Sequence, residues 1–478
     1  MNSCWRSTAV ETSKLWSTVV VKLSQINGSS SQLDMLTTAL QRSKGSPLHI
    51  VLHCDSPIKS TRLFDILLEH VNQWETLCVS QDSSHLVVDD SSIFTNVSND
   101  MNCRLRKFQF NRHRSFARKW GRPVFNKRAH FLIVQSLIPY LGQLRYIELH
   151  ELSHFFLPDG TLPPIPWNQV SHLIVGHFSM VQILTVLGRC SQIETLELLD
   201  HMTIESVEES DQATFDPIQL EKLRSLVIHT QTEKGGPAEL HKDILPYLVL
   251  PRLERLEIRQ IKEECNMESI IHLASSYHAN LQSIDLELMC TVPMDVTIER
   301  LLRCIPHCTH LTLRGRLFSH LFHLMAAPID RPLLPRLESL QVLLNANWDT
   351  LCPAFKAVLN AGFSIPTLRS LHVETFEEAV DFDQELAARL DKLRASGVET
   401  KVDWVKNPGD GWASWPQLIF KMIMRILTYA FRNYPHQLPG TIWRISHQHV
   451  RENAPILDEV MGILEGFQEA GSIQRQDV

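Results

Sequence analysis

Apolar residues recur along most of this chain in one short pattern, apolar-x-x-apolar-x-apolar, in which x is usually polar. The clearest copy lies within residues 335–342, where Leu337, Leu340 and Val342 are the apolar positions. The alternation at the end of the pattern is typical of a β-strand with one buried face. The eleven copies begin at residues 74, 105, 144, 170, 193, 223, 253, 281, 308, 337 and 368.

These copies return with a nearly constant period. Their fourth residues run from position 77 to position 371, which is 294 residues in ten intervals with a mean of 29.4, and the last six intervals lie between 27 and 31. One short strand and one helix cannot bury an apolar face alone, so a period of this length indicates units stacked on one another. The alternative is coincidence, since unrelated α/β proteins also contain strands of this kind.

The repeated unit, with Pro335 ahead of its strand and Asn345 in the turn after it, resembles a leucine-rich repeat. Helical spacing in the intervening segments completes the units. The predicted helices cover residues 33–42, 60–72, 129–141, 178–190, 267–277, 296–305, 352–361 and 382–395. The sequence therefore predicts an irregular α/β leucine-rich-repeat solenoid with a parallel sheet on the concave side, helices on the convex side and helical caps.

The pattern divides the chain into three predicted regions. Residues 1–24 form an N-terminal cap, and residues 25–402 form the solenoid. Two further strands are expected ahead of the first copy, at residues 18–21 and 47–52.

After residue 402 the pattern changes. Three tryptophans stand among Pro and Gly, and two amphipathic helices are predicted at residues 418–431 and 456–467. Because the last unit of a solenoid exposes an apolar edge, residues 403–478 are predicted to form a helical cap. A separate pair of partner-binding helices is the alternative.

Short motifs near the start of the chain resemble the closing half of an F-box, as found in fungal F-box proteins with leucine-rich-repeat-like tails. The matching residues are Trp5, Arg6, Ala9, Leu15, Trp16 and Ser17. The resemblance covers residues 4–80 by motif and residues 140–400 by the style of the repeats. The alternative is that the two tryptophans are cap aromatics that cover the first repeat.

This resemblance implies a function. In that family the F-box docks to a Skp-type adaptor of a cullin ubiquitin ligase, while the repeats hold a protein substrate. The implied adaptor contacts are Trp5, Arg6, Leu15 and Trp16. The Leu-Pro-x-Glu-Ile helix that opens the family's F-box would lie before Met1, so the F-box is incomplete in this sequence. A stand-alone scaffold outside any ligase is therefore the alternative.

Alternate residues of a strand face opposite sides of its sheet, so the fifth and seventh positions of each copy are expected to face away from the core. The fifth positions include four acids and a histidine: Glu148, Glu197, Glu257, Asp285 and His372. We expect this stripe on the concave face to bind a basic or donor-rich segment of a protein partner. An ordinary solvated sheet face is the alternative.

A basic segment is a second candidate surface. Residues 101–147 contain eleven Lys and Arg and no Asp or Glu, with interleaved aromatic residues. The candidate patch consists of Arg104, Arg106, Lys107, Arg112, Arg114, Arg118 and Lys119. Such a segment can bind a phosphate backbone or an acidic partner. A solvated loop with its aromatics in the core is favoured over nucleic-acid binding, because no reader motif is present.

An acidic segment balances it. Residues 190–221 contain nine Asp and Glu and no Lys or Arg. We expect a protruding loop here that repels nucleic acid and attracts basic surfaces, including the chain's own.

Composition describes an ordinary globular chain, with 478 residues, 44 % hydrophobic residues and a net charge of −7. No secretory apolar run opens the sequence, and the most apolar helical stretch is too short and too charged for a membrane span. The ten cysteines show no paired framework. They therefore indicate reduced thiols and a cytoplasmic or nuclear location.

One cluster has metal-binding residue types, at Cys304, His307, Cys308 and His310. Zinc sites usually draw a second ligand pair from a distant segment, so a helix end packed into the solenoid is the preferred interpretation. No phosphate loop, nucleophile elbow or metalloprotease motif occurs. The sequence thus predicts no catalytic residue, metal or cofactor, and we expect a monomeric interaction protein.

Overall fold

The computed structural model describes residues 11–26, 30–54, 62–81, 104–112, 142–150, 156, 161–176, 178–199, 216–229, 244–261, 265–288, 295–315, 325, 333–344, 356–362, 365–375 and 384–404. The chain divides into two compact units. The first comprises Met1–Val373 with Phe382–Val402, and the second comprises Glu374–Asp381 with Asp403–Val478. Because most of the second unit lies outside the described residues, the fold below is that of the first.

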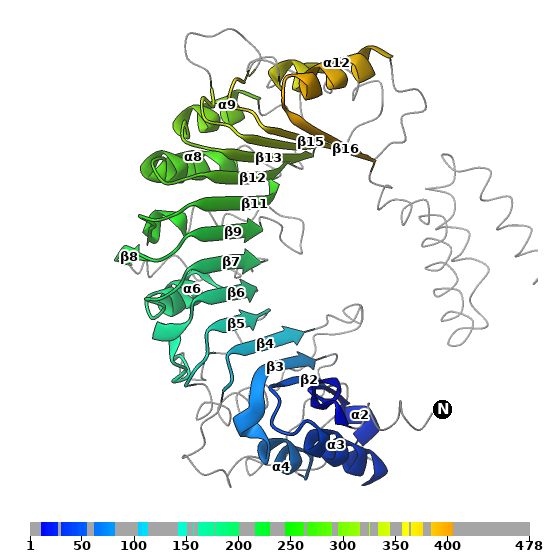
Figure 1. Ribbon diagram of the computed structural model, residues 1–478. Coiled ribbons are helices and arrows are strands. Elements are labelled where there is room, and N and C mark those ends of the chain that lie inside the picture. Colours follow the sequence, from blue (N-terminus) through cyan, green and yellow to red (C-terminus); the bar gives the residue numbers. More distant parts are fainter. Residues whose placement is uncertain are drawn as a thin grey trace, which may run out of the picture. The chain divides into compact units, whose positions relative to one another are not determined.

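A sheet of fourteen strands runs through the described residues, and its strands neighbour one another in chain order (Figure 1). Every registered pair from β1 to β14 is parallel. The strands are β1 (Thr18–Lys22), β2 (Leu48–Cys54), β3 (Trp74–Gln81), β4 (Lys107–Arg112), β5 (Tyr146–Leu149), β6 (His172–Gly176), β7 (Thr195–Leu199), β9 (Ser225–His229), β11 (Arg255–Ile261), β12 (Ser283–Leu288), β13 (His310–Gly315), β14 (Ser339–Leu344), β15 (Ser370–Thr375) and β16 (Glu399–Trp404). A second, two-stranded parallel sheet joins β8 (Ile218–Gln219) and β10 (Leu248–Val249).

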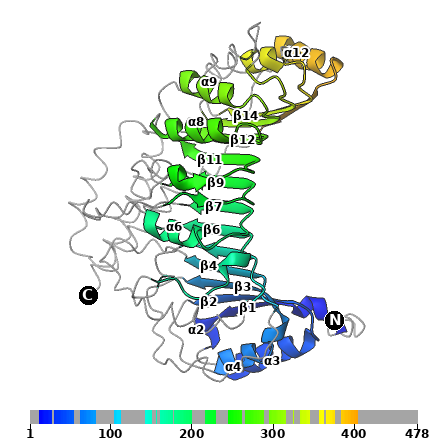
Figure 2. The same cartoon turned by 90° about the vertical axis from the view of Figure 1, so that its left-hand side faces the viewer.

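The strands share one register. The fourth residue of each motif copy lies beside the fourth residue of the next copy, from Leu77 in β3 to Leu340 in β14. The two earlier strands continue this row, because Val19 pairs with Ile50 and Ile50 with Leu77. Figure 2 shows strands β6 to β12 stacked in this order.

The three apolar positions of the motif face a single hydrophobic core. In all eleven copies the residues at positions 1, 4 and 6 are buried, and together they belong to one continuous cluster. Positions 3, 5 and 7 lie on the opposite side of the sheet, which we call the polar face. Most of the described side chains there are half-buried or exposed.

A repeated hydrogen bond fixes the start of each strand. The carbonyl oxygen at position 2 accepts the N–H groups of positions 2 and 3 of the next copy, as Arg106 O accepts from Arg145 and Tyr146 at 2.9 and 3.0 Å. The same arrangement recurs at nine successive carbonyls, ending at Glu338. A carbonyl oxygen has two lone pairs, so this bond satisfies both and holds neighbouring copies in one register.

Helices and short turns connect the strands and complete the core. They are η1 (Ser13–Trp16), α2 (Leu23–Ile26), α3 (Ser30–Arg42), α4 (Arg62–Leu68), η2 (Val71–Gln73), η6 (Trp167–Gln169), α6 (Met180–Leu187), η7 (Leu245–Tyr247), α8 (Cys265–Tyr277), α9 (Asp295–Cys304) and α12 (Gln384–Ala395), and residues 356–362 are also helical. In Figure 1, α6, α8 and α9 lie one above another on the same side of the strands. Ile183, Ile270 and Leu301 from these three helices join the cluster that the strands bury.

The predicted mixed α/β architecture with one long parallel sheet is confirmed, and the arrangement is consistent with a solenoid-like fold. The predicted helices at 129–141, 418–431 and 456–467 lie outside the described residues, as do residues 200–215 of the acidic segment 190–221. The last strand, β16, was not predicted. Its alignment through the bond from Glu399 N to Arg369 O puts Lys401 at position 4, so it lacks the apolar signal.

Gly315 shows how closely neighbouring strands of the sheet approach each other. It has a φ of +116°, and a Cβ built on it would lie 1.9 Å from Leu288 O in the adjacent strand. Gly397 has a similar φ of +92°, but nothing lies within 4 Å of its Cβ position. Comparing the same substitution at these two glycines therefore separates the cost of backbone strain from the cost of a steric clash.

We predict that Gly315→Ala lowers the free energy of unfolding by more than about 3 kcal/mol, since strain and a backbone clash combine. Gly397→Ala should cost only the strain of the left-handed region, about 1–2 kcal/mol. Urea denaturation followed by circular dichroism measures both. Equal costs for the two variants would show that β12 and β13 do not approach as described.

Candidate functional site

The polar face carries the acids that the sequence placed at position 5. The register sets Gln109, Glu148, Ile174, Glu197, Val227, Glu257, Asp285, Thr312 and Gln341 side by side on successive strands. His372 follows on β15 and is half-buried. The predicted row is therefore present, and the contacts of its carboxylates determine what it can bind.

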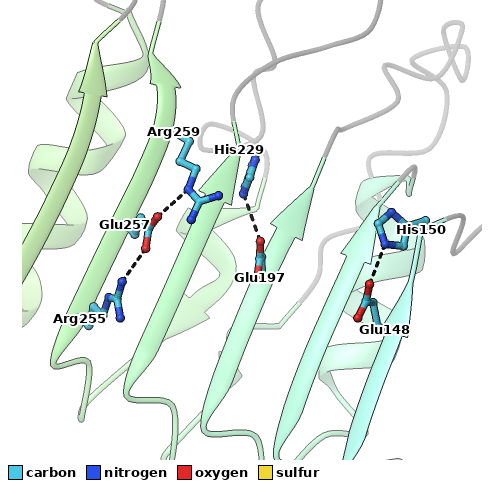
Figure 3. Close-up of polar contacts among 7 residues, drawn as sticks. All are labelled: Glu148, His150, Glu197, His229, Arg255, Glu257 and Arg259. Carbon is cyan, nitrogen blue, oxygen red and sulfur yellow. Dashed lines mark hydrogen bonds and ion pairs between the residues drawn. The ribbon is translucent and has the colours of Figure 1, made fainter. Parts of the chain in front are cut away.

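Glu148 lies at the centre of a polar cluster on β4 and β5. Its Oε2 accepts hydrogen bonds from Gln109 Nε2 at 2.5 Å and from the Tyr146 hydroxyl at 2.9 Å. Its Oε1 lies 2.9 Å from His150 Nε2, as Figure 3 shows. The hydrogen bond from His150, together with those from Gln109 and Tyr146, outweighs partial burial and lowers the pKa of Glu148 to about 2. This carboxylate is therefore charged at every physiological pH and already has its partners.

Glu197 has one partner from the neighbouring strand. His229 Nε2 on β9 lies 3.2 Å from Glu197 Oε1 on β7 (Figure 3). Ile174 and Val227 flank Glu197 in the row. Glu197 thus lies between two aliphatic side chains in the row, and its carboxylate contacts the histidine of the neighbouring strand.

Glu257 lies between two arginines of its own strand. Arg255 donates from NH2 to Oε2 at 2.8 Å, and Arg259 donates from Nε to Oε1 at 2.6 Å (Figure 3). The Glu257 side chain is 4 % exposed, whereas Arg255 is 55 % and Arg259 is 41 % exposed. Burial alone would raise the pKa of Glu257, but the bonds and charges of Arg259 and Arg255 outweigh it and lower that pKa.

Asp285 repeats the arrangement of Glu197 three strands further on. Arg314 NH2 on the next strand donates to Asp285 Oδ2 at 2.8 Å. The Asp285 side chain is 11 % exposed and that of Arg314 is 38 % exposed. Here burial dominates and raises the pKa of Asp285, while the charge of Arg314 opposes the rise.

Two pairing relations therefore alternate along the sheet. Glu148 and Glu257 bond to positions 3 and 7 of their own strand, whereas Glu197 and Asp285 bond to position 7 of the next strand. At Glu257 and Asp285 the acid is sunken and the base is the more exposed member. The acids of this row are therefore paired with basic or polar neighbours. At Glu257 and Asp285 the most exposed groups are the guanidiniums of the arginines.

The remaining predicted site residues lie elsewhere or outside the described part. Trp5, Arg6, Arg114, Arg118 and Lys119 lie outside the described residues. Arg104, Arg106 and Lys107 lie at the start of β4, and Arg112 is its last residue.

The implied adaptor contacts that are described lie in η1. Leu15 is 64 % exposed. Trp16 is half-buried, and the Arg42 guanidinium lies 4.8 Å from the centroid of its ring. Leu15 is therefore accessible to a partner, whereas Trp16 also contacts α3.

The Cys304–His310 cluster is built as a strand entry. Cys308 is buried and its thiol donates to His310 O at 3.2 Å. Burial raises the pKa of this thiol to about 11. Among the described residues, no group of three or more His, Cys, Asp or Glu could hold a metal ion.

Comparison with known proteins adds no assignment, because no model of a protein family and no curated protein matches the sequence. Within the described parts of the chain, none of the helices has the length and apolar character that crossing a bilayer requires.

We predict that Glu257→Gln lowers the free energy of unfolding by about 1–3 kcal/mol, because two arginines lose the charge between them. Glu254→Gln, one position before the strand, is the matched control. Glu254 is about half exposed and lies 3.7 Å from Arg224, so its loss should cost less than about 1 kcal/mol. Urea denaturation at neutral pH measures the cost of each substitution. Similar costs would mean that the buried contacts of Glu257 with its two arginines do not stabilise the fold.

Proposed function

We propose that this chain is a leucine-rich-repeat solenoid of the F-box type that binds a partner protein on its polar face and performs no chemistry itself. One observation carries this proposal. Strands from units about thirty residues apart share a register, so one face of the sheet packs against the core and the other carries a row of mostly polar side chains, with Ile174 and Val227 as its aliphatic members. Such a surface suits the binding of another protein chain.

The hydrogen bonds on the polar face support a binding role. Side chains such as Tyr146, Glu148 and Glu257 are held by neighbours on the same sheet. A surface whose side chains are already ordered loses less entropy when a partner binds. The paired charges also offer donors and acceptors in fixed positions, which favours specificity for one partner.

The proposed cellular role follows the F-box resemblance. Residues 4–17 would contribute to docking with a Skp-type adaptor of a cullin ligase, and the repeats would hold a protein substrate. The exposed Leu15 is consistent with an adaptor contact. The alternative is a scaffold that holds its partner without a ligase. In either role we propose a monomer in the cytoplasm or nucleus, as the cysteine pattern favours.

Site-specific photo-cross-linking tests the surface. We predict that a photoreactive residue in place of Ser225 or Ser339, both at position 3 of the polar face, cross-links a partner protein in cells. The same residue in place of Ser276, an exposed serine of α8, should not. Mass spectrometry of the adducts identifies the partner. Capture from Ser276 alone would place the binding surface on the helices and contradict the proposal.

A second arm of this experiment separates the ligase role from the scaffold role. A photoreactive residue in place of Leu15 should cross-link a purified Skp-type adaptor, whereas one in place of Val296 should not. Val296 is a suitable control because it is equally exposed and apolar, at 67 % against 64 %, but lies in α9. Cross-links from the polar face without an adaptor adduct from Leu15 would favour the scaffold.

A further inference from the structure

Position 2 of the repeats forms a second row, just ahead of the strands. Its carbonyl bonds join successive copies, so its side chains follow one another along one edge of the sheet. From β3 to β16 the row reads Glu75, Arg106, Arg145, Ser171, Glu194, Arg224, Glu254, Gln282, Thr309, Glu338, Arg369 and Glu399. Neighbouring members are about 4.8 Å apart at the backbone.

The arginines in this row are neutralised unequally. Arg224 lies between Glu194 and Glu254 and is 3.7 Å from the latter, and Arg369 has a glutamate on each side in the row, Glu338 and Glu399. Arg106 and Arg145 instead adjoin each other, with Arg106 N bonded to Glu75 O and Arg145 N to Arg106 O. Like charges on adjacent rungs repel, so this pair lowers stability unless a counter-charge is bound.

Two more cations adjoin this pair on β4. Arg104 is exposed, and Lys107 is half-buried beside Arg106. Among the described residues, Arg104, Arg106, Lys107 and Arg145 take part in no ion pair. Of the nearby carboxylates, Glu148 is bonded to Gln109, Tyr146 and His150, which leaves Glu75 as the one acid beside Arg106 in the row. The patch is therefore locally positive on a chain of net charge −7.

The structure also orients these cations. Arg145 NH1 donates to Gln169 O at 3.0 Å, which uses one of the five N–H donors of the guanidinium. Lys107 Nζ lies 4.3 Å from the centroid of the Tyr146 ring, and that ring stacks on His172 at 6.2 Å between centroids. Because contacts with neighbouring residues already order both side chains, these side chains lose less conformational entropy when a ligand binds.

We propose that Arg104, Arg106, Lys107 and Arg145 bind an Asp- and Glu-rich segment of the partner protein. This inference rests on the proposed function, because it names the chemistry of the partner. The four charges are spread along one strand entry and onto the next rung, and Lys107 is drawn towards Tyr146. They match successive carboxylates of an extended chain, about 6–7 Å apart on one side, better than a single convergent anion.

The same contacts argue against nucleic acid as the ligand. Tyr146, the aromatic residue of the patch, has Lys107 on its ring and His172 stacked on it, which leaves little ring surface for a base. The four cations of the patch that the structure describes can neutralise at most about four phosphates, and the negative net charge of the chain opposes a polyanion at longer range. A short acidic segment meets neither difficulty.

Fluorescence anisotropy with the full chain tests this assignment. The probe is a labelled ten-residue peptide rich in Glu and Asp, and its matched control is the same peptide with Gln and Asn. Arg106→Gln/Arg145→Gln should weaken binding of the acidic peptide at least tenfold. Arg224→Gln/Arg369→Gln removes the same charge from the same row and should change binding less than twofold. A cooperative thermal unfolding transition in both variants shows that they remain folded.

Several results would overturn the assignment. These are no binding of the acidic peptide, equal losses in the two double variants, or tighter binding of a phosphoserine peptide or a single-stranded oligonucleotide at the same arginines. The outcome is also separable from that of the proposed function. If the full chain does not bind the acidic peptide but still cross-links a partner from Ser225 and Ser339, only the proposed binding of an acidic segment by the four cations is refuted. Peptide binding without those cross-links would refute the partner-binding polar face.

Discussion

The shared register of the parallel strands is the constraint on which the rest of this structure depends. Apolar residues at positions 4 and 6 of each copy are buried only because the copies before and after cover them. The carbonyl at position 2 of each copy accepts two N–H groups from the next copy, and a one-residue slip of a strand would break both hydrogen bonds. Such a slip would turn every apolar residue of a strand towards the polar face.

The register also decides the chemistry of the other face. Residues about thirty positions apart become neighbours, so a charge can be paired across rungs as well as along a strand. Buried acids such as Glu257 and Asp285 can therefore each bond to a more exposed arginine. Where the row at position 2 places two arginines side by side, at Arg106 and Arg145, we propose that the excess positive charge binds a partner. The shared register of the strands thus accounts both for the fold and for the charge arrangement on which the proposed binding depends.

The sequence predicted the strands and their common register well because one motif repeats, and identical apolar spacing allows only one alignment of neighbouring copies. It also predicted the acidic row. It did not predict that Glu148 would bond to Gln109, or that Asp285 would bond to Arg314, because these contacts depend on side-chain rotamers on two neighbouring strands. The period-two rule could have suggested Arg255 and Arg259 as partners of Glu257, since all three share one strand face. Strand β16 had no apolar signal at Lys401 and was missed for that reason.

Distances between spin labels on the polar face test the chain-order register most directly. Labels carried by a genetically encoded amino acid at Thr76, Ser225 and Ser339 leave the native cysteines in place. Ser225 and Ser339 are four strands apart, and Thr76 and Ser339 are nine apart. At about 4.8 Å per strand, pulsed electron paramagnetic resonance should give about 19 Å for the first pair and on the order of 40 Å for the second. A Thr76–Ser339 distance no longer than the Ser225–Ser339 distance would contradict the stacked sheet.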